Sequence, residues 1–264
     1  MKNNLYRTHG EKPYRVVALH GGPGASGSLY DLCEEIGKEV GVIEILNQGM
    51  SIHEQVEEVF SVISLIGLQP VILVGHSWGA WLSIYYENAH PEQVDKLILI
   101  SSGPFDSEYV NQIEKTRTNR MSRKAKEKLS EHFVKINDED ETLANEHFAK
   151  AGQLISTLDS YEIDRADIDD KQKVDMKIYQ QIWAEASKRR QTGELMNALK
   201  SVQCRIQIIH GDHDPHPVDG VKRPLQKEGL NVKCFVLSKC GHYPWRERHA
   251  KANFYQILER LLNE

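Results

Sequence analysis

The chain has 264 residues, of which 40% are hydrophobic and 27% are charged, as expected for one large globular domain or a domain with an insertion. Its formal net charge of −5 and the lack of a long basic patch argue against nucleic-acid binding. No apolar run reaches the length of a membrane span, and the N-terminal residues lack the apolar core of a signal peptide. We therefore expect a cytoplasmic protein that does not engage a membrane.

The first hundred residues alternate between short apolar runs and segments with helical spacing. The apolar runs predict strands at 16–19, 40–46, 71–74 and 97–100. The helical segments are 52–66 and a second one that ends near residue 89. This alternation is typical of the α/β class, with a doubly wound, mostly parallel sheet covered on both faces.

Residues 105–200 have a different composition, because Lys, Glu, Gln, Ala and Leu dominate and β-type runs are almost absent. We interpret this segment as a helical cap that is inserted between two strands. Strands are predicted again at 206–209 and 232–237, followed by a final helix at 250–262. The predicted core is thus 1–104 plus 201–264. The four cysteines are widely spaced without a C-x-x-C pair, so we expect reduced thiols.

The pentapeptide at 75–79 follows the predicted strand 71–74 directly and precedes a helix. It reads Gly-His-Ser-Trp-Gly, a G-x-S-x-G pattern with Ser77 at its centre. The two glycines allow a sharp turn from strand to helix, and a side chain at either position would collide with backbone. Such a turn holds the serine in a strained conformation with its hydroxyl exposed above the sheet edge. Ser77 is therefore the candidate nucleophile.

Three polar residues follow three separate predicted strands, and together they form a candidate catalytic triad of Ser77, Asp214 and His242. Open α/β sheets bind ligands beyond the carboxyl ends of their strands, so these side chains can meet there. His242 can take the serine proton as general base, and an ionised Asp214 would fix its tautomer. Asp212 is the alternative acid, and the spacing from the preceding glycine favours Asp214.

A glycine-rich loop, His-Gly-Gly-Pro-Gly at 20–24, follows the predicted strand 16–19. The backbone N–H groups of Gly22 and Trp78 are the candidate oxyanion hole. We expect His20 to brace this loop and His76 to support the fold, neither acting on substrate.

These motifs resemble the α/β-hydrolase fold superfamily. The loop at 20–24 is similar to the HGGPG loop of its proline iminopeptidase branch, and 75–79 resembles that branch's GxSWGG, with Ala80 in place of the last glycine. The resemblance also includes the acid loop at 211–214 and the histidine loop at 241–244. It implies the α/β-hydrolase fold with an inserted cap, and a serine hydrolase activity.

The chain departs from that branch after its second predicted core strand. The branch usually has a D-x-R-G-x-G-x-S loop there, whereas 47–51 reads Asn-Gln-Gly-Met-Ser and lacks both the acid and the arginine. Aminopeptidases of the branch hold the substrate amine with cap glutamates. Glu162, Glu185 and Glu194 are candidates for that role.

We therefore expect a hydrolase of a small ester, amide or peptide bond that forms an acyl-enzyme on Ser77. Carboxylesterase and aminopeptidase-like activities are both open, as are a carbon–carbon bond hydrolase and a non-catalytic ligand receptor on the same fold. The partner expected is a small molecule or short peptide, and the oligomeric state is not predicted. No cofactor or metal is expected, although His210, His213 and His216 near two aspartates could suggest a metal set.

Overall fold

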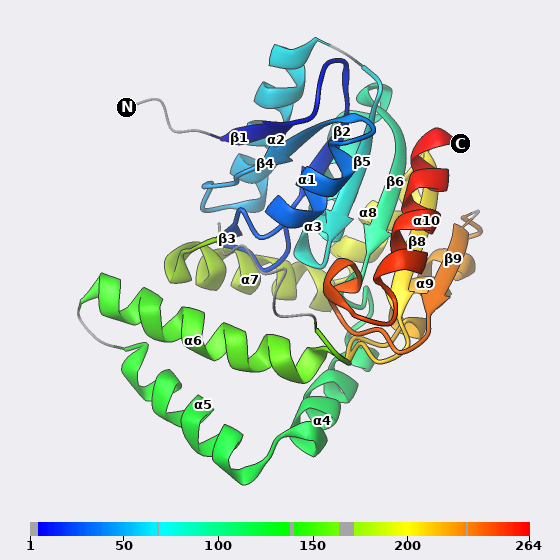
Figure 1. Cartoon of the computed structure of the whole chain (residues 1–264). Helices are drawn as coiled ribbons and strands as arrows, with labels where there is room; N and C mark the ends of the chain where they lie inside the picture. Colours follow the sequence, from blue (N-terminus) through cyan, green and yellow to red (C-terminus); the bar gives the residue numbers. More distant parts are fainter. Residues whose placement is uncertain (1–4, 68, 138–139, 164–171, 231) are drawn as a thin grey trace.

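The computed structural model describes residues 5–67, 69–137, 140–163, 172–230 and 232–264 (Figure 1). Its centre is a seven-stranded sheet in the order β1-β4-β2-β5-β6-β8-β9. β1 runs antiparallel to β4, and the other neighbouring pairs are parallel. The strands are β1 Tyr6–His9, β2 Tyr14–Leu19, β4 Gly41–Ile45, β5 Val71–His76, β6 Val94–Ile100, β8 Arg205–Gly211 and β9 Val232–Leu237.

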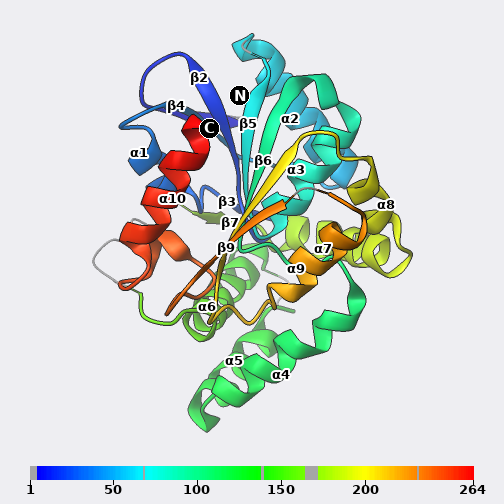
Figure 2. The same ribbon diagram turned by 90° about the vertical axis from the view of Figure 1, so that its right-hand side faces the viewer.

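Helices cover both faces of this sheet, as Figures 1 and 2 show. The helices are α1 Tyr30–Ile36, α2 Ile52–Ile66, α3 Trp78–Ala89, α4 Val110–Arg120, α5 Arg123–Lys135, α6 Glu141–Asp159, α7 Met176–Gln191, α8 Glu194–Ser201, α9 Asp219–Lys227 and α10 Lys251–Asn263. The expected doubly wound, mostly parallel α/β architecture is confirmed. In the part of the chain that the structure describes, no helix has both the length and the apolar character to cross a bilayer.

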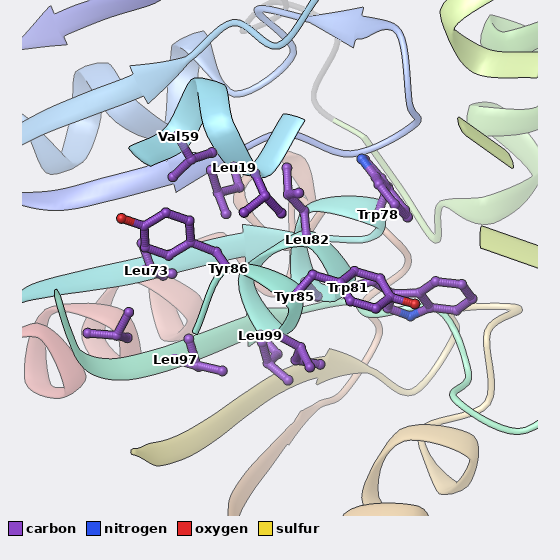
Figure 3. Close-up of a cluster of buried hydrophobic side chains, with 14 of the residues drawn as sticks. Leu19, Val59, Leu73, Trp78, Trp81, Leu82, Tyr85, Tyr86, Leu97 and Leu99 are labelled. Atoms are coloured by element: carbon purple, nitrogen blue, oxygen red, sulfur yellow. The ribbon is translucent and has the colours of Figure 1, made fainter. Parts of the chain in front are cut away.

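The sheet separates two hydrophobic clusters. One contains side chains of α2, α3, α7, α8 and α9, and Figure 3 shows its centre, where Leu82, Tyr85 and Tyr86 of α3 pack on sheet residues such as Leu73 and Leu97. The other lies on the opposite face under α1 and α10. This burial of both faces explains why β5 begins with the continuous apolar run Val71, Ile72, Leu73 and Val74.

Several elements were not predicted from the sequence. β1 is a four-residue edge strand whose Arg7 and His9 interrupt its apolar character, and α1 has only seven residues. α9 contains Pro224 and was also missed. A short antiparallel pair of strands, β3 Ala25–Ser26 and β7 Lys173–Val174, joins the glycine loop to the segment before α7. Elements this short carry too few residues for a periodic signal.

Helices α4 to α7 gather beyond the arrowheads of the parallel strands (Figure 1). α8 lies within the predicted insertion but packs on α3, and its Leu195 and Leu199 belong to the core cluster. The division into a core of 1–104 and 201–264 and a cap of 105–200 stays a prediction. All four cysteines are free, and burial raises the pKa of the Cys240 thiol far above its ordinary value.

Gly152 offers a test of helix stability inside α6. Nothing lies within 4 Å of a Cβ placed there, and its φ is not in the left-handed region. We expect Gly152→Ala to raise the free energy of unfolding by about 0.5–1 kcal/mol, because alanine loses less backbone entropy in a helix. Urea unfolding of both proteins measures the difference. A decrease in stability would show that α6 does not tolerate a side chain at this position.

Candidate active site

Ser77 lies in the sharp turn between β5 and α3, with φ 54° and ψ −111°. This positive φ is strained for a residue with a side chain. The two flanking glycines are required by close packing, because a Cβ on Gly75 would lie 2.4 Å from Gly79 O and one on Gly79 would lie 2.0 Å from Leu19 O. The predicted collision and the predicted strain are both confirmed.

Asp214 and His242 come together at the carboxyl ends of β8 and β9. His242 Nδ1 lies 2.8 Å from Asp214 Oδ2, and both residues are buried. Asp212, the alternative acid, instead accepts a hydrogen bond from the backbone N–H of Cys240 at 3.2 Å. The structure therefore pairs the histidine with Asp214, the residue that the glycine spacing favoured.

The environment keeps Asp214 ionised. Burial alone would raise its pKa, but the neighbouring imidazoles of His242 and His216, with their hydrogen bonds, hold the pKa well below its ordinary value. An ionised carboxylate only accepts hydrogen bonds, so the His242 Nδ1 atom that faces it carries a proton. The Nε2 atom of a neutral His242 is then free to accept a proton.

His76 connects the nucleophile strand to the histidine loop. Its Nε2–H donates to the backbone carbonyl of His242 at 3.0 Å. The centroids of the two imidazole rings are 4.8 Å apart. Burial lowers the pKa of His76 well below its ordinary value. A neutral imidazole at this position supports the loop without adding a positive charge beside His242.

The glycine loop lies against the nucleophile turn. A Cβ on Gly21 would lie 2.6 Å from His76 Nδ1 and 3.1 Å from Ser77 Cβ, so a side chain at this position would force the neighbouring residues to shift. His20 Nδ1–H donates to Gly21 O at 2.9 Å, which agrees with the expected bracing role. Gly22 has φ +41° and accepts a hydrogen bond from Ala25 N at 2.7 Å. This turn fixes the backbone at Gly22, which directly follows the residue that contacts Ser77.

Trp78 is the first residue of α3, where a backbone N–H has no carbonyl of the same helix to bind. Its indole is buried and donates from Nε1 to Gln55 Oε1 at 3.1 Å, so the ring packs towards α2. Ser77 and His242, which the structure both describes, are not joined by a hydrogen bond. Catalytic hydrogen bonds of this kind often tighten only when substrate binds.

Two buried acids that sequence reasoning missed fix the histidine loop. The Glu247 carboxylate accepts hydrogen bonds from the backbone N–H groups of Gly241 at 2.9 Å, Tyr161 at 2.9 Å and Glu162 at 2.7 Å. These contacts bind the loop to the segment after α6. No motif in the sequence distinguishes Glu247 from the many exposed glutamates.

Asp159, at the end of α6, is the second missed acid. Its backbone carbonyl accepts a hydrogen bond from His242 N at 2.9 Å. Its carboxylate pairs with Arg117 of α4 through Nε at 2.8 Å and Nη2 at 2.5 Å. This bidentate ion pair joins α4 and α6 next to the histidine loop.

The three glutamates considered as amine anchors make other contacts. Glu185 accepts from Ile52 N at 2.9 Å, at the start of α2, and also binds Arg189. Glu162 binds Arg248 and His249, and Glu194 accepts from the Thr192 hydroxyl.

The altered loop at 47–51 is held on α2. Asn47 Nδ2 donates to Glu58 Oε2 at 3.0 Å, and Gln48 N donates to the same carboxylate. The Glu58 carboxylate thus fixes the first two residues of this loop against α2.

Among the residues that the structure describes, two groups have side-chain ligand atoms within 4.8 Å of one another, close enough to be tested as metal sites. One is Asp214, His216 and His242, and the other is His9, Cys33 and Glu44, which are all buried. In the first group Asp214 Oδ1 lies 2.7 Å from His216 Nδ1, so the imidazole N–H groups already satisfy the carboxylate. In the second, His9 Nε2 lies 3.1 Å and Arg7 lies 3.4 Å from Glu44 Oε2.

Comparison with known proteins gives one family match. A family model described as alpha/beta hydrolase fold matches residues 14–245. A proline iminopeptidase of Lactobacillus helveticus is 28% identical over 287 aligned residues, which cover 98% of this chain and 94% of that protein.

Solved structures show the same fold. The crystal structure of VinJ matches with a TM-score of 0.69 and 16% identity, covering 98% of this chain and 94% of its own. A proline iminopeptidase of Mycobacterium smegmatis matches with a TM-score of 0.62 and 16% identity, covering 98% and 93%. At these identities the structural likeness concerns the fold alone.

The packing at Gly79 predicts that Gly79→Ala will not form the native turn, because its Cβ would overlap Leu19 O. We expect loss of soluble protein or a decrease in unfolding free energy of at least about 3 kcal/mol. Thermal unfolding and circular dichroism measure this. A variant as stable as the wild type would contradict the close approach of β2 to this turn.

Glu247→Gln tests the link between the histidine loop and the segment after α6. The amide has one acceptor oxygen where the carboxylate has two, and its NH₂ would face backbone N–H donors. We expect a loss of about 2–3 kcal/mol in urea unfolding, typical of a buried hydrogen-bonding group left without partners. Glu259→Gln, an exposed site on α10, is the matched control and should change stability by less than about 0.5 kcal/mol.

Proposed function

Because the chain belongs to the alpha/beta hydrolase fold family, we propose that it is a serine hydrolase that cleaves a small ester, amide or peptide bond through an acyl-enzyme on Ser77. One observation carries this proposal. The strained Ser77 lies at the end of β5, and a buried Asp214–His242 pair with a 2.8 Å hydrogen bond lies at the same edge of the sheet.

The proposed reaction starts when Ser77 Oγ attacks the substrate carbonyl carbon. His242 Nε2 takes the hydroxyl proton as Ser77 Oγ forms its bond to the carbonyl carbon, and Asp214 stabilises the resulting imidazolium. The N–H groups of Gly22 and Trp78 donate to the oxyanion. Collapse of the tetrahedral species breaks the bond to the leaving group, which takes the proton from His242. This leaves an acyl group on Ser77.

Water then completes the cycle. His242 takes a proton from a water molecule, whose oxygen attacks the acyl carbon, and the oxyanion forms again at Gly22 and Trp78. When the ester bond breaks, Ser77 Oγ recovers its proton from His242 and the acid product leaves. The negative charge of Asp214 stabilises the transient imidazolium of His242. The neutral His76 adds no positive charge beside it.

We also propose that 105–200 acts as the cap over this site. The position of α4 to α7 beyond the strand ends supports it, as does the β3–β7 pairing next to the glycine loop (Figure 1). Asp175 N, just before α7, donates to Gly24 O at 2.8 Å. The substrate is then a small molecule or a short peptide that fits between the cap and the strand ends.

Two substrate classes remain in competition. The similarity to a proline iminopeptidase of Lactobacillus helveticus favours an aminopeptidase-like activity. The loop at 47–51 without its acid and arginine favours a carboxylesterase, as do Glu162, Glu185 and Glu194, which are all engaged in other contacts.

A fluorophosphonate probe tests the nucleophile. We expect covalent labelling of the wild type and none of Ser77→Ala, because the probe reacts with an activated serine hydroxyl. Ser77→Ala should also lower ester turnover by at least about 10³-fold. Gel fluorescence and intact mass measure the adduct. An unlabelled wild-type protein would remove the support for this assignment and favour a non-catalytic binding role.

A pair of substrates separates the two classes. Proline naphthylamide is compared with its N-blocked form and with nitrophenyl acetate and butyrate. An aminopeptidase should hydrolyse the free amide and lose that activity when the amine is blocked, since it must hold a charged amine. A carboxylesterase should hydrolyse the nitrophenyl esters and leave both amides intact. Release of naphthylamine and of nitrophenol gives kcat/KM for each.

A further inference from the structure

Asp214 binds two histidines, and only His242 has a place in the proposed reaction. His216 Nδ1 lies 2.7 Å from Asp214 Oδ1, and His216 N donates to the same oxygen at 2.9 Å. His242 Nδ1 contacts the other oxygen, Oδ2, at 2.8 Å. Each oxygen of the buried carboxylate therefore has one hydrogen-bonded imidazole, and His210 Nε2 lies 3.6 Å from Oδ2.

Both imidazoles have the same tautomer when neutral. Since the ionised Asp214 only accepts hydrogen bonds, the Nδ1 atoms of His216 and His242 each carry a proton. The two rings lie side by side, with centroids 4.5 Å apart and an angle of 32° between their planes. The His216 side chain is 13% exposed and that of His242 is 6% exposed, so the second imidazole lies on the outer side of the pair.

Charged and titratable groups from several elements face His216. They are Asp214 from the loop after β8, His210 from β8, His242 from the histidine loop and Arg117 from α4. His210 Nε2–H donates to His216 O at 2.7 Å, which fixes the backbone of the second histidine. Burial lowers the pKa of His216, and the attraction of Asp214 only partly offsets this. The second imidazole is thus neutral at neutral pH.

We propose that His216 is a positioning residue for the reaction proposed above, which holds Asp214 Oδ1 so that Oδ2 stays directed at His242. Its side-chain N–H and its backbone N–H together prevent the carboxylate from rotating. The hydrogen bond from His216 Nδ1–H also stabilises part of the negative charge on Asp214 Oδ1, so that less of this charge is directed at His242. The inference depends on His242 being the general base of that reaction.

His216→Ala and His216→Asn test this role. The alanine variant lacks the side-chain donor, and we expect kcat to fall about tenfold with KM unchanged, because a misdirected base costs rate without a loss of substrate contacts. The asparagine amide can donate to Asp214 Oδ1 from the place of Nδ1 and should restore kcat to within about twofold of the wild type. His213→Ala, in the same loop, is the matched control.

The pH dependence of kcat/KM distinguishes this role from a purely structural one, which would leave the pH profile unchanged. In His216→Ala the Asp214 carboxylate loses its hydrogen bond from the second imidazole. Its negative charge then stabilises the protonated form of His242 more strongly. The acid limb of the kcat/KM profile should therefore move to higher pH. In His216→Asn the donor is kept, and the limb should stay close to that of the wild type.

An NMR measurement tests the geometry without turnover. In ¹⁵N-histidine-labelled wild type we expect two low-field Nδ1–H proton signals, from His216 and His242. His216→Ala should remove one and shift the other, whereas His213→Ala should leave both in place. A His242 signal that does not respond to His216→Ala would overturn the inference.

The remaining outcomes separate the two proposals. If wild-type turnover does not depend on Ser77, the proposed function fails, and the NMR result still decides whether the two histidines share Asp214. If turnover depends on Ser77 but His216→Ala matches the wild type in kcat and pH profile, only the present inference fails. Equal losses of kcat and of the thermal midpoint in both His216 variants would also overturn it, since rescue by the amide would be absent.

Discussion

A carboxylate that is removed from water must be compensated by hydrogen bonds or by opposite charge, and the buried Asp214 side chain imposes this requirement on the whole site. Its two oxygens are satisfied by His242 on one side and by His216 on the other. Each imidazole must present a protonated Nδ1, so one buried charge fixes two tautomers and two ring orientations. Because Nδ1 of His242 is protonated, Nε2 is the nitrogen that acts as general base in the proposed reaction.

The loop that carries His242 is in turn held by groups from both halves of the chain. Glu247 binds it to the segment after α6, Asp159 binds it to the end of α6, and His76 binds it to β5. The Arg117–Asp159 ion pair extends this network to α4. Helices α4 and α6 thus belong to the same hydrogen-bond network as the loop that carries His242.

The central elements could be predicted closely from local pattern. The helix expected at 52–66 and the strand expected at 232–237 match α2 and β9, because periodic apolar spacing is strong over those lengths. The nucleophile turn was predicted in detail because steric exclusion at Gly75 and Gly79 is a local property. β1, α1 and α9 were missed, since a short edge strand, a seven-residue helix and a helix with Pro224 carry little periodic signal.

The sequence by itself determined the fold class and the strained turn at Ser77, and it favoured Asp214 over Asp212 as the partner of His242. These follow from patterns within a few residues, where sterics and spacing act along the chain. Only the tertiary structure decided that Glu247 and Asp159 hold the histidine loop, that His216 shares the Asp214 carboxylate, and that Glu185 of α7 accepts a hydrogen bond from the first residue of α2. Those roles depend on burial and on contacts between distant segments, and a polar residue looks the same in sequence whether solvent or a buried partner satisfies it.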